Sequence, residues 1–210
     1  MSGIWNDTPN GRYGPQVALV VVDVQNDFAD PAGSLYVKGG SEIVSLVNVE
    51  IELALVDGAV VVYTQDWHPS HTPHFAPDGG IWPVHCVAET WGAEMHKDLL
   101  VRGPIIRKGI HGEDGYSGFS MRNPAGGRLS PTELDATLAR TGTQRIVICG
   151  LATDYCVKAT ALDGIALGYR TALLVDATRA VDLAPGDGEL ALTELAAAGV
   201  ALVRDATRAG

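Results

Sequence analysis

The feature that most constrains the fold is an unbroken apolar run close to the start of the chain. Residues 17–24 read VALVVVDV, rich in β-branched side chains and ending beside a carboxylate. A strand with one face in water alternates apolar and polar residues, whereas a strand covered on both faces of a parallel sheet stays apolar throughout. The run therefore predicts an interior strand of a parallel sheet, covered by helices on both faces.

The rest of the chain alternates between strand and helix patterns. Further strands are predicted at 59–65, 104–108, 145–150, 171–176 and 200–204. Helices are predicted at 41–56, 130–141, 154–167 and 186–198, the second with Ser130 as N-cap, Pro131 at its first position and Glu133 completing a capping box. This order predicts an α/β fold of three layers, with a six-stranded, mostly parallel, doubly wound sheet and helices on both faces.

Length and composition bound the organisation of the chain. We expect one domain over residues 1–210, with residues 1–15 as an N-terminal arm suited to packing on a neighbouring copy, so that a homo-oligomer is an open alternative. The net charge of −10 argues against nucleic acid or an anionic membrane as partner. The three cysteines, the absence of a signal-peptide pattern and the absence of a long apolar run lead us to expect a cytoplasmic protein.

Chemically active side chains follow four of the predicted strands. Asp23 follows the first, Asp66 and His68 the second, Lys108 ends the third, and Cys156 comes shortly after the fourth. One charged residue at the end of a strand usually marks only the point where the chain reaches water. Ligands of parallel sheets bind beside the carboxyl ends of the strands, however, so several such residues at one edge indicate a functional crevice.

Cys156 lies in the first turn of a predicted helix, within VICGLATDYCVKAT. The positive end of a helix dipole favours the thiolate, and Lys108 nearby would favour it further. A carboxylate such as Asp23 would take the thiol proton and return it to a leaving group, and the N–H groups of the helix start would hold an oxyanion. We interpret Cys86 and Cys149 as interior thiols without a chemical role.

Histidines gather in a glycine- and proline-rich loop that covers residues 66–103, too long for a simple connection. Asp66 and His68 are one residue apart, so both side chains of an extended segment point the same way. His74 and His85 lie further along, and these four residues suit one divalent ion such as zinc, iron or manganese. The sequence has no CxxC pair, which argues against a closed structural zinc site, and we leave His71 out of the ligand set.

These segments together resemble the nicotinamidases and pyrazinamidases of the isochorismatase-like cysteine hydrolase superfamily. The matching segments are VVVDVQNDF, TQDWH, WPVHC, RKG and GLATDYCVKAT, in that order, and the resemblance spans residues 17–205. It implies a six-stranded parallel sheet and a metal-dependent hydrolase that converts nicotinamide to nicotinate and ammonia, as in NAD salvage.

The resemblance also implies residue roles. Cys156 would be the nucleophile, Asp23 the proton carrier and Lys108 the group that positions both. A cis peptide bond would join Leu151 to Ala152, with the N–H groups of Ala152 and Cys156 binding the oxyanion. Asp66, His68 and His85 would be metal ligands, with His74 as a fourth ligand found in some members. Phe28, Trp82 and Tyr116 would frame the aromatic ring of the substrate.

Other functions stay open at this point. An amidase of the same superfamily that acts on N-carbamoyl or ureido compounds would generally lack the metal ligands. A catalytically dead scaffold or metal-binding module would have no need of thiol, carboxylate and ammonium together. Isochorismatase proper has no cysteine nucleophile, and a Rossmann nucleotide-binding protein would carry GxGxxG after the first strand, which this chain lacks.

Overall fold

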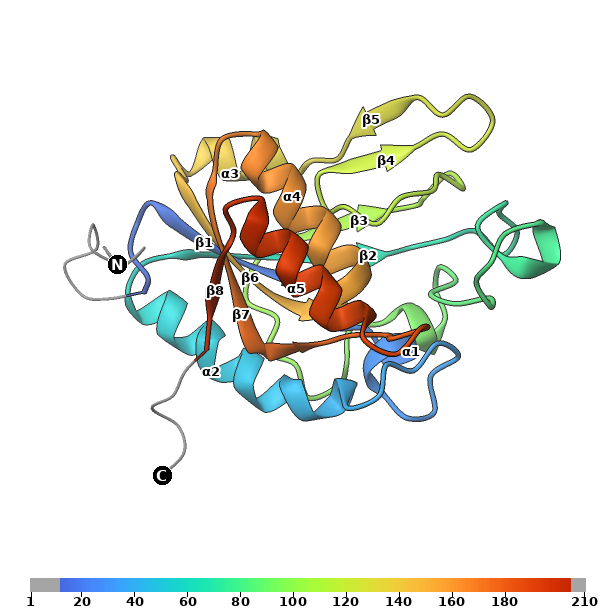
Figure 1. Ribbon diagram of the computed structural model, residues 1–210, viewed down its shortest axis with the longest axis horizontal. Helices are drawn as coiled ribbons and strands as arrows, with labels where there is room; N and C mark the ends of the chain where they lie inside the picture. Colours follow the sequence, from blue (N-terminus) through green and yellow to red (C-terminus); the bar gives the residue numbers. More distant parts are fainter. Residues whose placement is uncertain (1–11, 205–210) are drawn as a thin grey trace.

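A six-stranded sheet forms the centre of the computed structural model, which describes residues 12–204 (Figure 1). The strand order is β3-β2-β1-β6-β7-β8, and all neighbouring strands pair in parallel. Because the order runs outward from β1 in both directions, the sheet is doubly wound. The predicted α/β class and the predicted six-stranded sheet are confirmed.

The strands of the large sheet are β1 (Val17–Val22), β2 (Val60–Asp66), β3 (Ile105–Lys108), β6 (Arg145–Leu151), β7 (Arg170–Arg179) and β8 (Ala201–Val203). The helices are α1 (Asn26–Ala29), α2 (Ile43–Val56), α3 (Leu134–Arg140), α4 (Lys158–Ala166) and α5 (Asp187–Ala197), together with 3-10 turns at Gly40–Glu42, Ala76–Asp78 and Trp91–Ala93 and a π-helical turn at Thr153–Val157. A separate hairpin consists of β4 (Ser120–Arg122) and β5 (Leu129–Pro131).

β1 explains why the sheet needs helices on both faces. All six of its residues are buried, and successive side chains enter opposite cores. Leu19 and Val21 belong to the core beneath α2, whereas Val20 and Val22 belong to the core beneath α3, α4 and α5. The continuous apolar run in the sequence is therefore the signature of a strand between two helical layers.

Glycine is required where β6 passes the end of β1. Gly150 has φ +112°, and a Cβ atom built there would lie 2.0 Å from the carbonyl oxygen of Val22. The close approach brings the segment after β6 alongside Asp23, the residue that follows β1. The chain thus places the thiol-bearing turn next to the first carboxylate.

The predicted capping box at Ser130 and Glu133 is wrong. Residues 129–131 form β5, in which Ser130 pairs with Met121 of β4, and α3 begins only at Leu134. The hydroxyl of Thr132, not that of Ser130, accepts a hydrogen bond at the helix start, from the amide of Leu134 at 3.1 Å. Pairing of Ser130 with a residue nine positions earlier overrides the local helix signal.

The N-terminal arm expected over residues 1–15 lies largely outside the described residues. Of the part that is described, Tyr13 is buried and its hydroxyl donates a 2.7 Å hydrogen bond to Glu50 of α2. Arg12 forms an ion pair with the same carboxylate. Within residues 12–204, no helix has the length and apolarity needed to cross a lipid bilayer.

Candidate active site

Three neighbouring strands and the turn after a fourth bring their functional residues to one edge of the sheet. Asp23 follows β1, Asp66 and Lys108 end β2 and β3, and Cys156 lies in the π-helical turn after β6. Since β3, β2, β1 and β6 are consecutive in the sheet, these ends are adjacent in space. The structure therefore brings together the thiol, carboxylate and ammonium that the sequence indicated.

Lys108 is the centre of this cluster. Its side chain is buried, and Nζ lies 2.9 Å from the Asp23 carboxylate and 3.6 Å from the Cys156 sulfur, while it also donates to Asp66. The second Asp23 oxygen accepts a 2.7 Å hydrogen bond from the Thr64 hydroxyl. Asp23 has φ +47°, a left-handed conformation unusual outside glycine, which marks the position as functionally constrained.

The pKa of the Cys156 thiol is shifted in the direction opposite to the sequence-based expectation of a thiolate. Burial raises the pKa of the Cys156 thiol well above its ordinary value; the Lys108 ammonium lowers it, but the carboxylates of Asp23 and Asp66 raise it further. Burial also raises the pKa of Asp23, against the lowering effect of Lys108. The expectation considered only the helix dipole and Lys108, and it omitted both desolvation and the second carboxylate.

Asp66 is fixed through its backbone by Gln25, a residue without an assigned role in the sequence analysis. The Gln25 side chain accepts a 2.8 Å hydrogen bond from the Asp66 amide and donates one of 2.8 Å to its carbonyl. It also donates to the carbonyl of Ala93. A buried side-chain amide thus joins the end of β1 to the end of β2 and to the loop beyond.

Three histidines of the long loop come together beside Asp66. Ligand atoms of His68, His74 and His85 all lie within 4.8 Å of one another, and all three side chains are buried. Asp66 Oδ2 lies 3.8 Å from His68 Nε2. His71, left out of the predicted ligand set, is exposed and lies beside Asp78. The structure therefore juxtaposes all four predicted ligands.

The hydrogen bonds of the histidines fit a metal ion. His85 Nδ1 lies 2.7 Å from the carbonyl oxygen of Pro83 and His74 Nδ1 lies 2.7 Å from Asp114 Oδ1, so each Nδ1 is the donor and each Nε2 is the nitrogen available to a metal. Both ring nitrogens of His68 are buried without a hydrogen-bond partner. Orphaned buried nitrogens are costly, and a divalent ion would satisfy one of the two.

Protonation does not compete with metal binding at His85 near neutral pH. Burial lowers the pKa of His85 to about 4, although the carboxylate of Asp66 and the bond to Pro83 oppose this shift. A neutral imidazole is the form that binds metals. The donor set of three imidazoles and one carboxylate suits zinc, iron or manganese.

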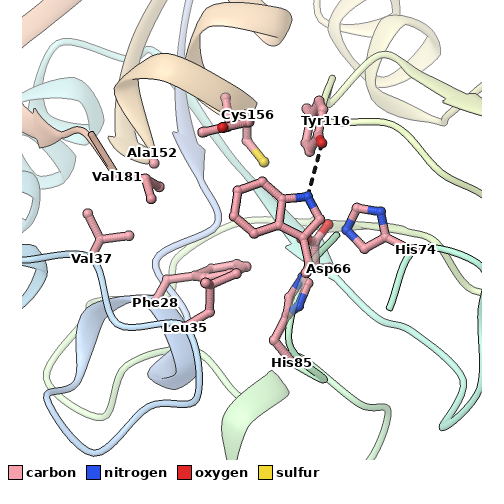
Figure 2. Close-up of a pocket in the computed structure, with 12 residues that line it drawn as sticks. Phe28, Leu35, Val37, Asp66, His74, His85, Tyr116, Ala152, Cys156 and Val181 are labelled. Carbon is pink, nitrogen blue, oxygen red and sulfur yellow. Dashed lines mark hydrogen bonds between the residues drawn. The ribbon is translucent and has the colours of Figure 1, made fainter. Parts of the chain in front are cut away.

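A pocket lies between the cluster and the histidines (Figure 2). Cys156 and Ala152 face it from one side and His74, His85 and Asp66 from the other. The three aromatic residues expected around the substrate, Phe28, Trp82 and Tyr116, all line it. Trp82 Nε1 donates a 3.0 Å hydrogen bond to the Tyr116 hydroxyl, which fixes both rings.

Other lining residues were not identified from the sequence. They are Leu35, Val37, Tyr155 and Val181. The ring of Tyr155 lies edge-on to that of Trp82, with 4.9 Å between centroids. The signal that could have identified Tyr155 in the sequence is its position directly before Cys156. Val181 follows β7, and nothing in the local pattern distinguishes it from an ordinary apolar residue.

The turn that carries Cys156 is hydrogen-bonded to the segment after β7 that contains Val181. The Asp154 carboxylate accepts hydrogen bonds of 2.9 Å from the amides of both Val181 and Asp182. On the other side of the turn, the peptide bond between Leu151 and Ala152 is cis, at the position that the resemblance implied. Cys86 and Cys149 are fully buried and do not line the pocket.

Comparison with known proteins identifies the family. Residues 17–207 match the isochorismatase domain. The chain belongs to the isochorismatase family. The nicotinamidase of Escherichia coli (strain K12) is 36% identical over 207 residues, which cover 90% of this chain and 94% of the relative.

Solved structures of family members have the same fold, and they include a pyrazinamidase and a protein in complex with nicotinate. The pyrazinamidase of Pyrococcus horikoshii in complex with zinc is 41% identical, with a TM-score of 0.81 over 90% of this chain and 99% of that one. An L. infantum protein in complex with nicotinate is 36% identical, with a TM-score of 0.80 over 90% of this chain and 93% of that one.

Proposed function

We propose that this protein hydrolyses nicotinamide to nicotinate and ammonia through a cysteine thioester. The observation that carries the proposal is a pocket lined on one side by Cys156, which belongs to the buried cluster with Lys108 and Asp23, and on the other by His74 and His85. Similarity to a nicotinamidase and to a protein that binds nicotinate, the product of this reaction, supports it.

The proton balance of the reaction runs through Asp23. Its carboxylate takes the proton of the Cys156 thiol as the sulfur attacks the amide carbon, and the N–H groups of Ala152 and Cys156 hold the oxyanion. Asp23 then gives that proton to the departing nitrogen, which leaves as ammonia. A water molecule, deprotonated by Asp23, attacks the thioester, and the sulfur leaves and regains its proton.

Lys108 holds the reacting groups in place. Its contacts with Asp23 and Cys156 keep the carboxylate and the sulfur on the same side of the pocket. Its positive charge also balances the charge of Asp23, which would otherwise be buried without a counter-ion. Because burial raises the pKa of the thiol, the thiolate nucleophile forms only as Asp23 accepts the proton.

Asp66, His68, His74 and His85 are the residues that would hold a divalent ion. Bound there, zinc, iron or manganese supplies a ligand position for the pyridine nitrogen, a base similar to imidazole. The aromatic residues then hold the ring on its faces. The main effect of this arrangement is to orient the amide over Cys156.

The rival function is hydrolysis of an N-carbamoyl or ureido acid. Such substrates carry a carboxylate, which proteins bind with arginine or lysine. Among the described residues that line the pocket there is no arginine or lysine, and the wall opposite the histidines is apolar, with Leu35, Val37 and Val181. The pocket therefore favours a neutral aromatic amide.

The three cysteines are free, which fits a cytoplasmic enzyme of NAD salvage.

An ammonia-release assay on a small set of amides tests the proposal. Nicotinamide should be hydrolysed, and benzamide, which lacks the ring nitrogen, should be hydrolysed much more slowly. A chelator should stop turnover, and added zinc, iron or manganese should restore it. Preference for an N-carbamoyl amino acid, or the absence of ammonia from nicotinamide, would contradict the proposal.

A further inference from the structure

The segment between β3 and β4 crosses the histidine loop and contacts it through Asp114. Asp114 Oδ1 lies 2.7 Å from Nδ1 of His74, although the two residues are 40 positions apart. The same oxygen accepts a 2.8 Å hydrogen bond from the amide of Gly115. The backbone of Asp114 pairs with Arg122 in both directions, so the hairpin holds this carboxylate in place.

The three histidines differ in how their rings are oriented. His85 donates to the carbonyl of Pro83, two residues earlier, so its own loop fixes its ring. His68 follows β2 directly, and its backbone pairs with Val87. His74 lies eight residues beyond β2, and its ring has its polar contact with a residue from a distant segment. The orientation of His74 therefore depends on Asp114.

We propose that Asp114 is a positioning residue for metal binding, which acts through His74. Its carboxylate keeps the proton on Nδ1 and turns Nε2 toward the ligand atoms of His68 and His85. Asp114 does not line the pocket and contacts neither the thiol nor the proposed substrate. This inference rests on the proposed function, because it assigns a partner to one of the proposed metal ligands.

Zinc affinity of the full-length apoprotein, measured by competition with a chromophoric chelator, tests the inference without reference to activity. Asp114→Ala should weaken zinc binding by about 10–100-fold. Asp114→Asn, whose side-chain oxygen still accepts a hydrogen bond, should lose less. Glu113→Ala is the matched control: Glu113 is the preceding residue and accepts only the amide of His111 among the described contacts, so its zinc affinity should equal that of the wild type.

A double-mutant comparison shows whether Asp114 acts through His74. Once His74→Ala has removed the ring, Asp114→Ala should cause no further loss of affinity. An equal loss in both backgrounds, or wild-type affinity of Asp114→Ala, would overturn the role of Asp114 while leaving the metal site in place. A wild-type protein that binds no zinc, iron or manganese would instead contradict the proposed function, and this inference with it.

Discussion

At the scale of single residues, the site depends on an imbalance of buried charge. One ammonium, Lys108, faces two carboxylates, Asp23 and Asp66, and the pKa of Lys108 is raised by both although burial opposes this. The pKa of Asp66 is lowered by Lys108 and His68, again against burial. Asp66 therefore stays ionised, and burial together with the charges of Asp23 and Asp66 raises the pKa of the neighbouring Cys156 thiol, against the lowering effect of Lys108.

Replacement of Cys156 should abolish activity without unfolding the protein. Cys156→Ala removes the only sulfur that faces the pocket within residues 12–204, so ammonia release should fall by at least about 10³-fold. The loss of one buried sulfur should cost about 1–2 kcal/mol of unfolding free energy. Urea unfolding and an ammonia assay measure the two effects.

Cys149→Ala is the matched control for this prediction. Cys149 is fully buried in β6 and does not contact the pocket, so this variant should be destabilised to a similar extent and keep its rate. If Cys156→Ala retained wild-type activity, the thioester route would have to be abandoned.

The acid side of the pH profile should report Asp23. The reaction needs the carboxylate form, and burial raises the pKa of Asp23 above the ordinary 3.8. As pH falls through this raised pKa, Asp23 becomes protonated and kcat/KM declines, so the midpoint should lie above 3.8. Asp23→Asn should lose about 10²–10⁴-fold in rate at neutral pH. A midpoint at or below 3.8 would mean that another group controls this limb.

The residues of the chemical cluster were predictable because they end strands or begin a helix. Position in a parallel sheet alone places Asp23, Lys108 and Cys156 at one edge. The supporting residues were not predictable in this way. Gln25 and Asp114 act through side-chain contacts with segments 40 or more residues away, and a contact of that range leaves no periodic trace in the sequence.

At the scale of elements, the strands were predicted well and the connections poorly. β1 and β6 contain short, β-branched apolar runs, which are typical of interior strands of a parallel sheet, and both strands are completely buried. The hairpin of β4 and β5 escaped prediction because its strands are only three residues long and partly exposed. Its pairing then took Ser130 away from the predicted helix start.

The link between the π-helical turn and the segment after β7 should be measurable. Asp154→Ala leaves the amides of Val181 and Asp182 without their acceptor, at a cost of about 1–3 kcal/mol in unfolding free energy. Because Val181 lines the pocket, KM for nicotinamide should rise more than kcat falls. Urea unfolding and steady-state kinetics measure both.

Glu189→Gln serves as the control for this link. Glu189 is exposed in the first turn of α5 and does not line the pocket, so the unfolding free energy and KM should both stay close to the wild-type values. Equal behaviour of Asp154→Ala and Glu189→Gln would show that the hydrogen bonds from Asp154 do not shape the pocket.

At the scale of the whole molecule, bound metal should add to the stability of the fold. An ion that binds only the folded chain, at a free concentration of 100 times its dissociation constant, contributes about 2.7 kcal/mol. For a chain of this size, this corresponds to a rise of about 5–10 °C in the unfolding midpoint. A thermal scan with zinc and with a chelator measures the difference.

Two histidine variants complete this experiment. His74→Ala should reduce the zinc-dependent shift, because His74 is buried among the proposed ligands. His71→Ala should leave it unchanged, because the His71 side chain is 83% exposed. If the thermal unfolding midpoint of the wild type did not change with zinc, the histidines would hold no ion.

The two halves of the site come from different kinds of structure. The ends of β1 and β3 and the turn after β6 supply the hydrolytic groups, whereas His74 and His85 belong to the loop between β2 and β3. Two of the four proposed metal ligands thus lie in a stretch of the chain that carries none of the hydrolytic groups. Substitutions confined to residues 69–103 would accordingly change how the ion and the ring are held, and would affect turnover through the orientation of the amide and not through the thiol itself.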